Sequence, residues 1–156
     1  MDLLDKNISR KSVFVINGPN LNLLGRRDRL LYGSLSLDEV NTGLKIKFGD
    51  RVNLCFFQSN HEGTLIDMIQ AAGRRSDCLG IVINPGAYAH TSLALADALA
   101  DYAIQGHPYI EVHISDILSR EPLRHSSLTA RNALKMISGH GTNGYSEAVD
   151  LLLQKS

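Results

Sequence analysis

The sequence lacks an excess of charge of either sign. Sixteen lysines and arginines balance sixteen aspartates and glutamates, so the formal net charge is zero when the histidines are neutral. A protein that binds nucleic acid or an anionic membrane usually presents a field of positive charge. We therefore expect neither partner, and any anionic ligand must be held by a local cluster of residues.

The sequence also has only two cysteines and no long apolar run. Cys55 and Cys78 form no Cys-x-x-Cys pair and lack the spacing of a metal site, so we interpret both as small core residues in a reducing compartment. No apolar run approaches the roughly 20 residues of a membrane-spanning helix. Residues 1–12 mix both charges and lack an apolar signal core, which predicts a flexible leader and a cytoplasmic location.

Five short apolar runs alternate with stretches of helical periodicity. The run 79–84 is rich in β-branched residues and has no polar face, as expected of a strand that is covered on both sides. Ser36 and Glu39 can form a capping box, which predicts that the first helix begins at Ser36. The predicted strands are 13–17, 51–58, 79–84, 109–113 and 135–138, and further helices are expected at 61–74, from 91, and at 144–154.

This alternation predicts an α/β fold with a five-stranded parallel sheet and helices on both faces. Five strands favour a flavodoxin-like three-layer sandwich with strand order 2-1-3-4-5. We expect residues 13–156 to form one such catalytic domain, with its ligand at the carboxyl ends of the strands.

Polar segments follow four of the predicted strands. The first strand leads into NGPNLNLLGRRDRLLYG, the second into QSNHEG, the third into NPGAYAHTS, and the fourth into EVHISD and REPLRHSS. The carboxyl ends of parallel strands meet at one edge of the sheet, so these side chains should gather there. One such segment would be an ordinary exposed loop, whereas four at the same edge indicate a polar ligand.

Taken together and in this order, the segments resemble those of type II 3-dehydroquinate dehydratase, from about residue 13 to residue 152. Each motif is weak alone, but the set is specific. The resemblance implies a hydro-lyase that converts 3-dehydroquinate to 3-dehydroshikimate by trans-dehydration through an enolate, without metal or cofactor. Both the shikimate pathway of aromatic amino acid biosynthesis and quinate catabolism need this step.

The resemblance gives Tyr32 the role of base and Arg27 the role of activating it, while Asn20 helps to hold a water and the enolate oxygen. A free phenol ionises near pH 10, and about 4 kcal/mol of stabilisation would let a phenolate act near pH 7. One guanidinium at about 4 Å supplies roughly that energy at an effective dielectric constant of about 20. An isolated Tyr-Gly pair would more simply begin a turn. Arg26 and Arg29 do not match the family's position and are interpreted as solvated loop residues.

Glu111 and His113 lie two apart on a predicted strand and therefore share a face. A carboxylate beside an imidazole fixes its tautomer and favours its protonated form. The resemblance implies that His113 is the acid that protonates the departing hydroxyl and that Glu111 orients it. Alone, the pair could be a buried histidine beside a chance glutamate. A zinc site that also uses His90 is disfavoured, because no helical HxxxH or cysteine ligand supports it.

The substrate-binding residues also come from the resemblance. Asn84, His90 and Arg124 should bind the ring hydroxyls. The substrate carboxylate should meet the main-chain N–H groups of Ile114 and Ser115, where we expect a short helix to begin.

Two other chemical interpretations are disfavoured. A Schiff-base route requires a lysine in the site, and no lysine lies in a site motif. A flavodoxin-like ligand-binding or regulatory domain without catalysis is the main alternative, but GPNLNLLG has too few glycines to cradle phosphates.

Several positions depart from the family pattern. Asp28 and Arg29 stand where Glu-Pro is common, so the loop that carries Tyr32 loses a rigid turn residue. We expect this loop to be mobile until substrate binds. Asp116 could weaken carboxylate binding if its side chain points inward. The other departures are Ala89 for a frequent threonine and Lys135 for a glycine.

The resemblance further implies a homo-oligomer, a dodecamer built as a tetramer of trimers. Asp97 matches an aspartate that reaches a neighbouring subunit's site. Its helix, SLALADALADYA, is apolar around much of its circumference, which is typical of burial on two sides. Burial inside a monomer would produce the same pattern.

Overall fold

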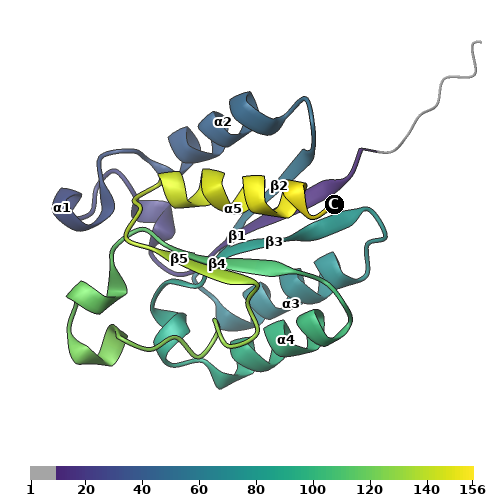
Figure 1. The fold of residues 1–156 in the computed structure, drawn as a ribbon. Coiled ribbons are helices and arrows are strands. Elements are labelled where there is room, and N and C mark those ends of the chain that lie inside the picture. Colours follow the sequence, from purple (N-terminus) through teal and green to yellow (C-terminus); the bar gives the residue numbers. More distant parts are fainter. Residues whose placement is uncertain (1–9) are drawn as a thin grey trace, which may run out of the picture.

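A five-stranded parallel sheet lies at the centre of the computed structural model, which describes residues 10–156 (Figure 1). Its strands are paired in the order β2-β1-β3-β4-β5, which confirms the predicted flavodoxin-like arrangement. β1 begins at Ser12, inside the expected leader, whose residues 1–9 lie outside the described part of the chain. The strands are β1 (Ser12–Asn17), β2 (Asn53–Gln58), β3 (Cys78–Asn84), β4 (Tyr109–His113) and β5 (Lys135–Ser138).

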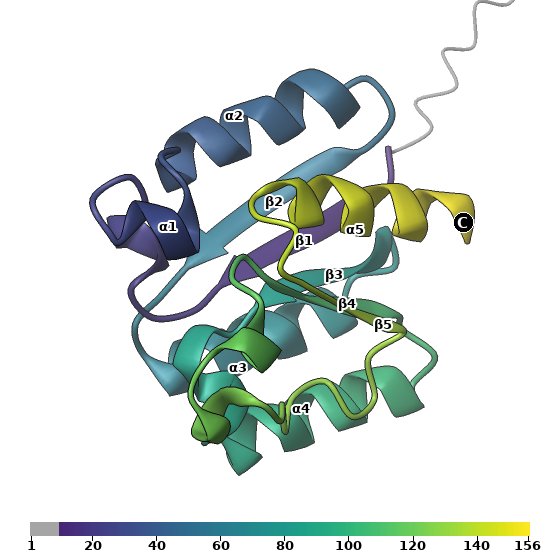
Figure 2. The ribbon, with the colours of Figure 1, turned by 60° about the vertical axis from the view of Figure 1, so that its left-hand side comes forward.

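Two helices cover each face of the sheet (Figures 1 and 2). One face carries α2 (Leu37–Phe48) and α5 (Asn143–Gln154), and the other carries α3 (Glu62–Gly73) and α4 (Leu93–Ile104). Within residues 10–156, no helix is long and apolar enough to cross a membrane.

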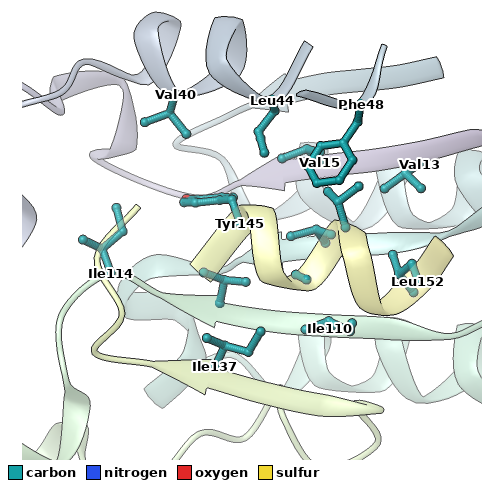
Figure 3. Close-up of a cluster of buried hydrophobic side chains, with 14 of the residues drawn as sticks. Val13, Val15, Val40, Leu44, Phe48, Ile110, Ile114, Ile137, Tyr145 and Leu152 are labelled. Atoms are coloured by element: carbon teal, nitrogen blue, oxygen red, sulfur yellow. The ribbon is translucent and has the colours of Figure 1, made fainter. Parts of the chain in front are cut away.

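The core consists of two apolar clusters, one on each face of the sheet. Side chains alternate along a strand, so Val13 and Val15 pack toward α2 and α5 while Phe14 packs toward α3 and α4. Figure 3 shows the first cluster, in which Tyr145 and Leu152 of α5 lie against the sheet. Each such buried side chain stabilises the fold by about 1.5–3 kcal/mol.

Hydroxyl caps begin two of the long helices. Ser36 and Glu39 form the predicted capping box: the Ser36 hydroxyl accepts the Glu39 N–H at 3.2 Å, and the Ser36 N–H donates to the Glu39 carboxylate at 2.7 Å. This main-chain hydrogen bond lowers the pKa of Glu39. Ser92 caps α4 by accepting the Leu95 N–H at 2.8 Å. The caps therefore set where these helices start.

Five short helical segments extend from the carboxyl ends of the strands. Three of the predicted site residues lie on them: Tyr32, His90 and Arg124. The segments are η1 (Leu21–Leu23), α1 (Arg29–Tyr32), η2 (Gly86–His90), η3 (Ile117–Ser119) and η4 (Pro122–Arg124).

Two glycines allow the loops after β1 and β3 to touch. A Cβ atom on Gly18 would lie 2.5 Å from the carbonyl oxygen of Pro85, far inside contact distance. Gly86 has a φ of +59° and faces the carbonyl oxygen of Pro19. Only glycine accommodates both demands, and the two loops together form one wall of a pocket.

Candidate active site

A pocket at the carboxyl ends of β1, β3 and β4 brings together all of the predicted site residues except Glu111 and Asp97. Arg120, which the sequence did not single out, joins them. The lining side chains come from segments far apart in the chain, as expected where parallel strands end. The predicted residues that line the pocket are Asn20, Arg27, Tyr32, Asn84, His90, His113, Ile114, Ser115 and Arg124.

The Tyr32 hydroxyl lies between two guanidinium groups. Arg27 donates to it at 3.1 Å, with the guanidinium carbon 3.9 Å from the centroid of the Tyr32 ring. Arg120 donates to the same oxygen at 3.2 Å and to the Ser115 hydroxyl at 3.1 Å. Two cations at these distances stabilise a negative charge on the phenol oxygen. The sequence holds no signal for the second cation beyond its place in the segment REPLRHSS.

The segment that carries Tyr32 is held by a helix N-cap at Asp28. Asp28 accepts the N–H of Leu30 at 2.9 Å and begins α1. Gly33 ends the helix with a φ of +74°. The expected mobility of this loop stays a prediction, and the Asp28 cap stabilises the conformation that the loop adopts in this structure.

Glu111 and His113 form a buried pair, as their spacing on one strand predicts. His113 Nε2 lies 2.6 Å from Glu111 Oε1, and the carboxylate is fully buried. Glu111 lies behind the imidazole and does not line the pocket, whereas His113 does. Nε2 faces the carboxylate, so the Nδ1 edge of the ring is left for the pocket. Within residues 10–156, no three potential metal ligands converge on one point.

Asn84 is held by hydrogen bonds on both sides of its amide. Its oxygen accepts the Gly86 N–H at 3.1 Å, and its nitrogen donates to the Tyr145 hydroxyl at 3.0 Å. Tyr145 in turn donates to the side-chain oxygen of Asn17 at 2.5 Å. Burial raises the pKa of the Tyr145 hydroxyl, so it remains a donor. An amide nitrogen has two protons, which leaves one N–H of Asn84 for a ligand.

His90 and Arg124 also line the pocket. The His90 ring stacks on that of His113 with a centroid distance of 6.1 Å, and its Nδ1 lies 2.8 Å from the carbonyl oxygen of Ser126. Arg124 donates to Glu121 at 2.6 Å, so its charge is already partly compensated. Both side chains therefore have defined orientations before any ligand binds.

Ile114 and Ser115 offer main-chain N–H groups that have no hydrogen-bond acceptor among residues 10–156. The prediction that a helix begins at these residues is wrong, because η3 begins at Ile117. Asp116 is the N-cap: its carboxylate accepts the Leu118 N–H at 3.0 Å. The charge of Asp116 therefore points to this helix and not into the pocket.

Asn20 is positioned by a residue that the sequence did not assign. It has a left-handed φ of 67°, and its main-chain N–H donates to the side chain of Asn60 at 3.0 Å. Gln58 donates to the same oxygen of Asn60 at 3.1 Å and to the carbonyl of Gly18 at 3.1 Å. The QSNHEG segment thus positions Asn20, a pocket residue, through the side chain of Asn60.

The remaining predicted positions lie away from the pocket. Asp97 is exposed on α4, and a single chain does not test its predicted contact with a neighbouring subunit. Lys135 is exposed on the edge strand β5, where a lysine is readily solvated. Ala89 is fully buried, and its carbonyl accepts the Leu128 N–H at 2.7 Å.

Comparison with known proteins gives one consistent result. The family model described as dehydroquinase class II matches residues 11–153. The 3-dehydroquinate dehydratase 1 of Ralstonia nicotianae is 47% identical over 156 residues, covering 98% of this chain and 97% of that protein. The catabolic 3-dehydroquinase 1 of Aspergillus terreus is 50% identical over 141 residues, covering 90% of each. The crystal structure of the type II dehydroquinase from Butyrivibrio crossotus has a TM-score of 0.86 and 42% identity, covering 93% of this chain and 99% of that one.

Proposed function

The chain belongs to the dehydroquinase class II family and is a lyase of the 3-dehydroquinate dehydratase type, and we propose that Tyr32 is the base that begins its reaction. As a phenolate, Tyr32 removes a proton from the carbon beside the ketone of 3-dehydroquinate. The electron pair of that C–H bond moves into an enolate. The enolate then expels the neighbouring hydroxyl, which leaves as water and yields the conjugated enone 3-dehydroshikimate.

One observation carries this proposal: the Tyr32 oxygen accepts hydrogen bonds from both Arg27 and Arg120, at 3.1 and 3.2 Å. At an effective dielectric constant of about 20, a cation at about 4 Å stabilises an anion by roughly 4 kcal/mol. Both guanidinium groups therefore stabilise the negative charge that the phenol oxygen carries when it acts as a base.

His113 is the proposed acid. Its Nε2 is occupied by Glu111, so the proton given to the departing hydroxyl comes from Nδ1. The proton that Tyr32 takes from carbon balances the one that His113 gives to oxygen, and both groups are reset by exchange with water. Asn20 lines the same pocket and is the proposed holder of a water and the enolate oxygen.

The proposed substrate contacts follow from the groups left free in the pocket. The N–H groups of Ile114 and Ser115 are suited to the substrate carboxylate, which explains how a protein without net charge holds an anion. Asn84, His90 and Arg124 are the proposed partners of the ring hydroxyls. The free N–H of Asn84 requires an oxygen acceptor at that point.

The decisive test is the Tyr32→Phe variant with 3-dehydroquinate as substrate. Formation of the conjugated enone, followed by ultraviolet absorbance, should fall by roughly 10²–10⁴-fold, the usual contribution of a general base. Circular dichroism and thermal melting should match the wild type, because the hydroxyl lies in the pocket and not in either core cluster. Wild-type turnover in this variant would eliminate Tyr32 as the base.

A further inference from the structure

Glu111 is fully buried, yet its carboxylate receives hydrogen bonds from three directions. His113 Nε2 lies 2.6 Å from Oε1, the Ser127 hydroxyl donates to Oε1 at 2.5 Å, and the Thr129 hydroxyl donates to Oε2 at 2.6 Å. Neither hydroxyl lines the pocket, so neither can touch a ligand there. Both hydroxyl groups donate to the carboxylate, and their oxygens lie 3.1 Å apart.

The number of protons available determines which partner donates in each of these hydrogen bonds. A carboxylate without a proton only accepts hydrogen bonds, so each of its three neighbours must be the donor. The Ser127 oxygen already accepts the Ala130 N–H at 3.1 Å, which leaves its own proton for Glu111. His113 must then carry a proton on Nε2 whether the ring is neutral or charged.

We propose that Ser127 and Thr129 are positioning residues that hold Glu111 so that neutral His113 keeps its proton on Nε2 and presents Nδ1 to the pocket. If Glu111 rotated or took up a proton, Nε2 could lose its acceptor, and the other tautomer would place an N–H toward the pocket in the neutral ring. That neutral ring could give up its Nδ1 proton only by becoming an imidazolate, so it would be a poor acid. The expected effect on kcat rests on the proposed role of His113 as the acid. The expected position of the proton on the His113 ring does not depend on that role.

The segment 127–129 is itself anchored from separate elements. The Thr129 carbonyl accepts the Tyr109 hydroxyl at 2.6 Å, inside the core. The Leu128 N–H donates to the carbonyl of Ala89, on the segment that carries His90. Thr129 is 1% exposed. The two hydroxyls are therefore held in place without the carboxylate, as a positioning role requires.

Nitrogen NMR of the histidine rings tests the tautomer directly. The chain has six histidines, and the signal of His113 is identified by its loss in His113→Asn. In the wild type, neutral His113 should show a protonated Nε2 and an unprotonated Nδ1. In Thr129→Val, and more strongly in the Ser127→Ala/Thr129→Val double variant, both tautomers should appear. Thr129→Val nearly conserves shape and main-chain contacts, so it remains informative if the double variant folds poorly.

Enone formation from 3-dehydroquinate supplies the second measurement. Each single variant should lower kcat by about tenfold with KM little changed, since a hydrogen bond to a charged group is lost outside the pocket. Thr129→Ser keeps the hydroxyl and should restore both tautomer and kcat. Ser126→Ala is the matched control, because Ser126 is exposed and contacts His90 only through its carbonyl.

The outcomes separate this proposal from the proposed reaction. A wild-type tautomer and wild-type kcat in the double variant would overturn the positioning role. A tautomer change with unaltered kcat would retain the positioning of Glu111 but remove His113 as the acid. A fall in kcat with an unaltered tautomer would overturn the proposal that the two hydroxyls control the tautomer of His113.

Discussion

Tyr32 and its two arginines are the residues on which the proposed chemistry most depends. Arg27 is five positions from Tyr32 and belongs to the same loop, whereas Arg120 arrives from the segment after β4, 88 positions away. Both donate to one oxygen, so the loss of either cation removes stabilisation from the phenolate.

Arg27→Met and Arg120→Met should therefore each lower kcat by at least about tenfold in the enone assay, because each removes a cation from the base. Arg29→Met is the matched control, since Arg29 is exposed on α1 and, among residues 10–156, Arg27 and Arg120 are the arginines that donate to the Tyr32 hydroxyl. Full activity of Arg120→Met would mean that Arg27 alone activates the base.

At this scale the sequence predicted pairs that are close in the chain and missed those that are distant. Glu111 and His113 are two apart on a strand, so alternation alone places them on one face. Ser127 and Thr129 reach Glu111 from a loop with no periodicity, and no spacing rule links them. Arg120 was missed for the same reason.

At the scale of single elements, α1 is a four-residue helix whose start depends on Asp28. Amide hydrogen exchange of residues 26–32 should slow when 3-dehydroshikimate binds, since the loop is expected to close over the ligand. Asp28→Ala should speed exchange in the free protein, because an N-cap contributes about 1 kcal/mol. Asp28→Asn keeps a capping oxygen and serves as its control. Exchange unchanged by ligand would contradict the expected closure.

Asp77, next to the first residue of β3, forms a hydrogen bond with Ser12, the first residue of β1. It accepts hydrogen bonds from Arg75 at 2.9 and 2.8 Å and from the Ser12 hydroxyl at 2.7 Å. Arg75, followed by Ser12, holds the pKa of Asp77 well below its usual range. A lowered carboxyl pKa stabilises the fold above the unfolded-state value and loses that effect as pH falls toward the folded-state value.

Asp77→Asn should thus lower the free energy of unfolding by about 1 kcal/mol at pH 7, the net value of such a hydrogen bond. The difference from wild type should shrink progressively below about pH 4, where an ordinary aspartate takes up its proton. Urea denaturation at pH 7 and pH 3 measures both. Asp67→Asn, at an exposed position on α3, should show no such pH dependence. A constant difference would mean that the charge of Asp77 contributes nothing.

Short elements were also where the sequence prediction was least accurate. A helix was expected at Ile114 and Ser115, but it begins at Ile117. Asp116 takes the capping position, and the Ser138 hydroxyl, from β5, accepts the Ile117 N–H at 3.1 Å. The second contact comes from a distant strand, so local sequence could not supply it.

For the molecule as a whole, the parallel sheet and its order were predictable from the alternation of strands and helices. β-Branched runs and capping signals are local, and right-handed crossovers leave few topologies for five strands. The sequence could not decide whether α4 is buried within one chain or also against a second chain. Both arrangements produce the same apolar stripe on the helix.

Assembly is the prediction that belongs to this scale. We expect a dodecamer in which Asp97, exposed on α4, enters a neighbouring subunit's site. Sedimentation should give a single large species, and Asp97→Ala should lower turnover. When Tyr32→Phe and Asp97→Ala chains are unfolded and refolded together, activity should partly return, because some sites then combine an intact Tyr32 with an intact Asp97. A fully active monomer, or no recovery on mixing, would refute a shared site.

The hydroxyl of Tyr145 has a consequence for how the enzyme matures during translation. It joins Asn84 to Asn17, 128 positions earlier in the chain, from a helix that follows every strand in chain order. At about 5–20 residues per second, Asn17 is synthesised roughly 6–26 s before Tyr145. A nascent chain can therefore assemble β1 beside β3 while the polar ends of both strands still lack their bridge. The pocket should therefore become able to bind substrate only after α5 has packed onto the sheet, and catalytic activity should appear late in the folding of the chain.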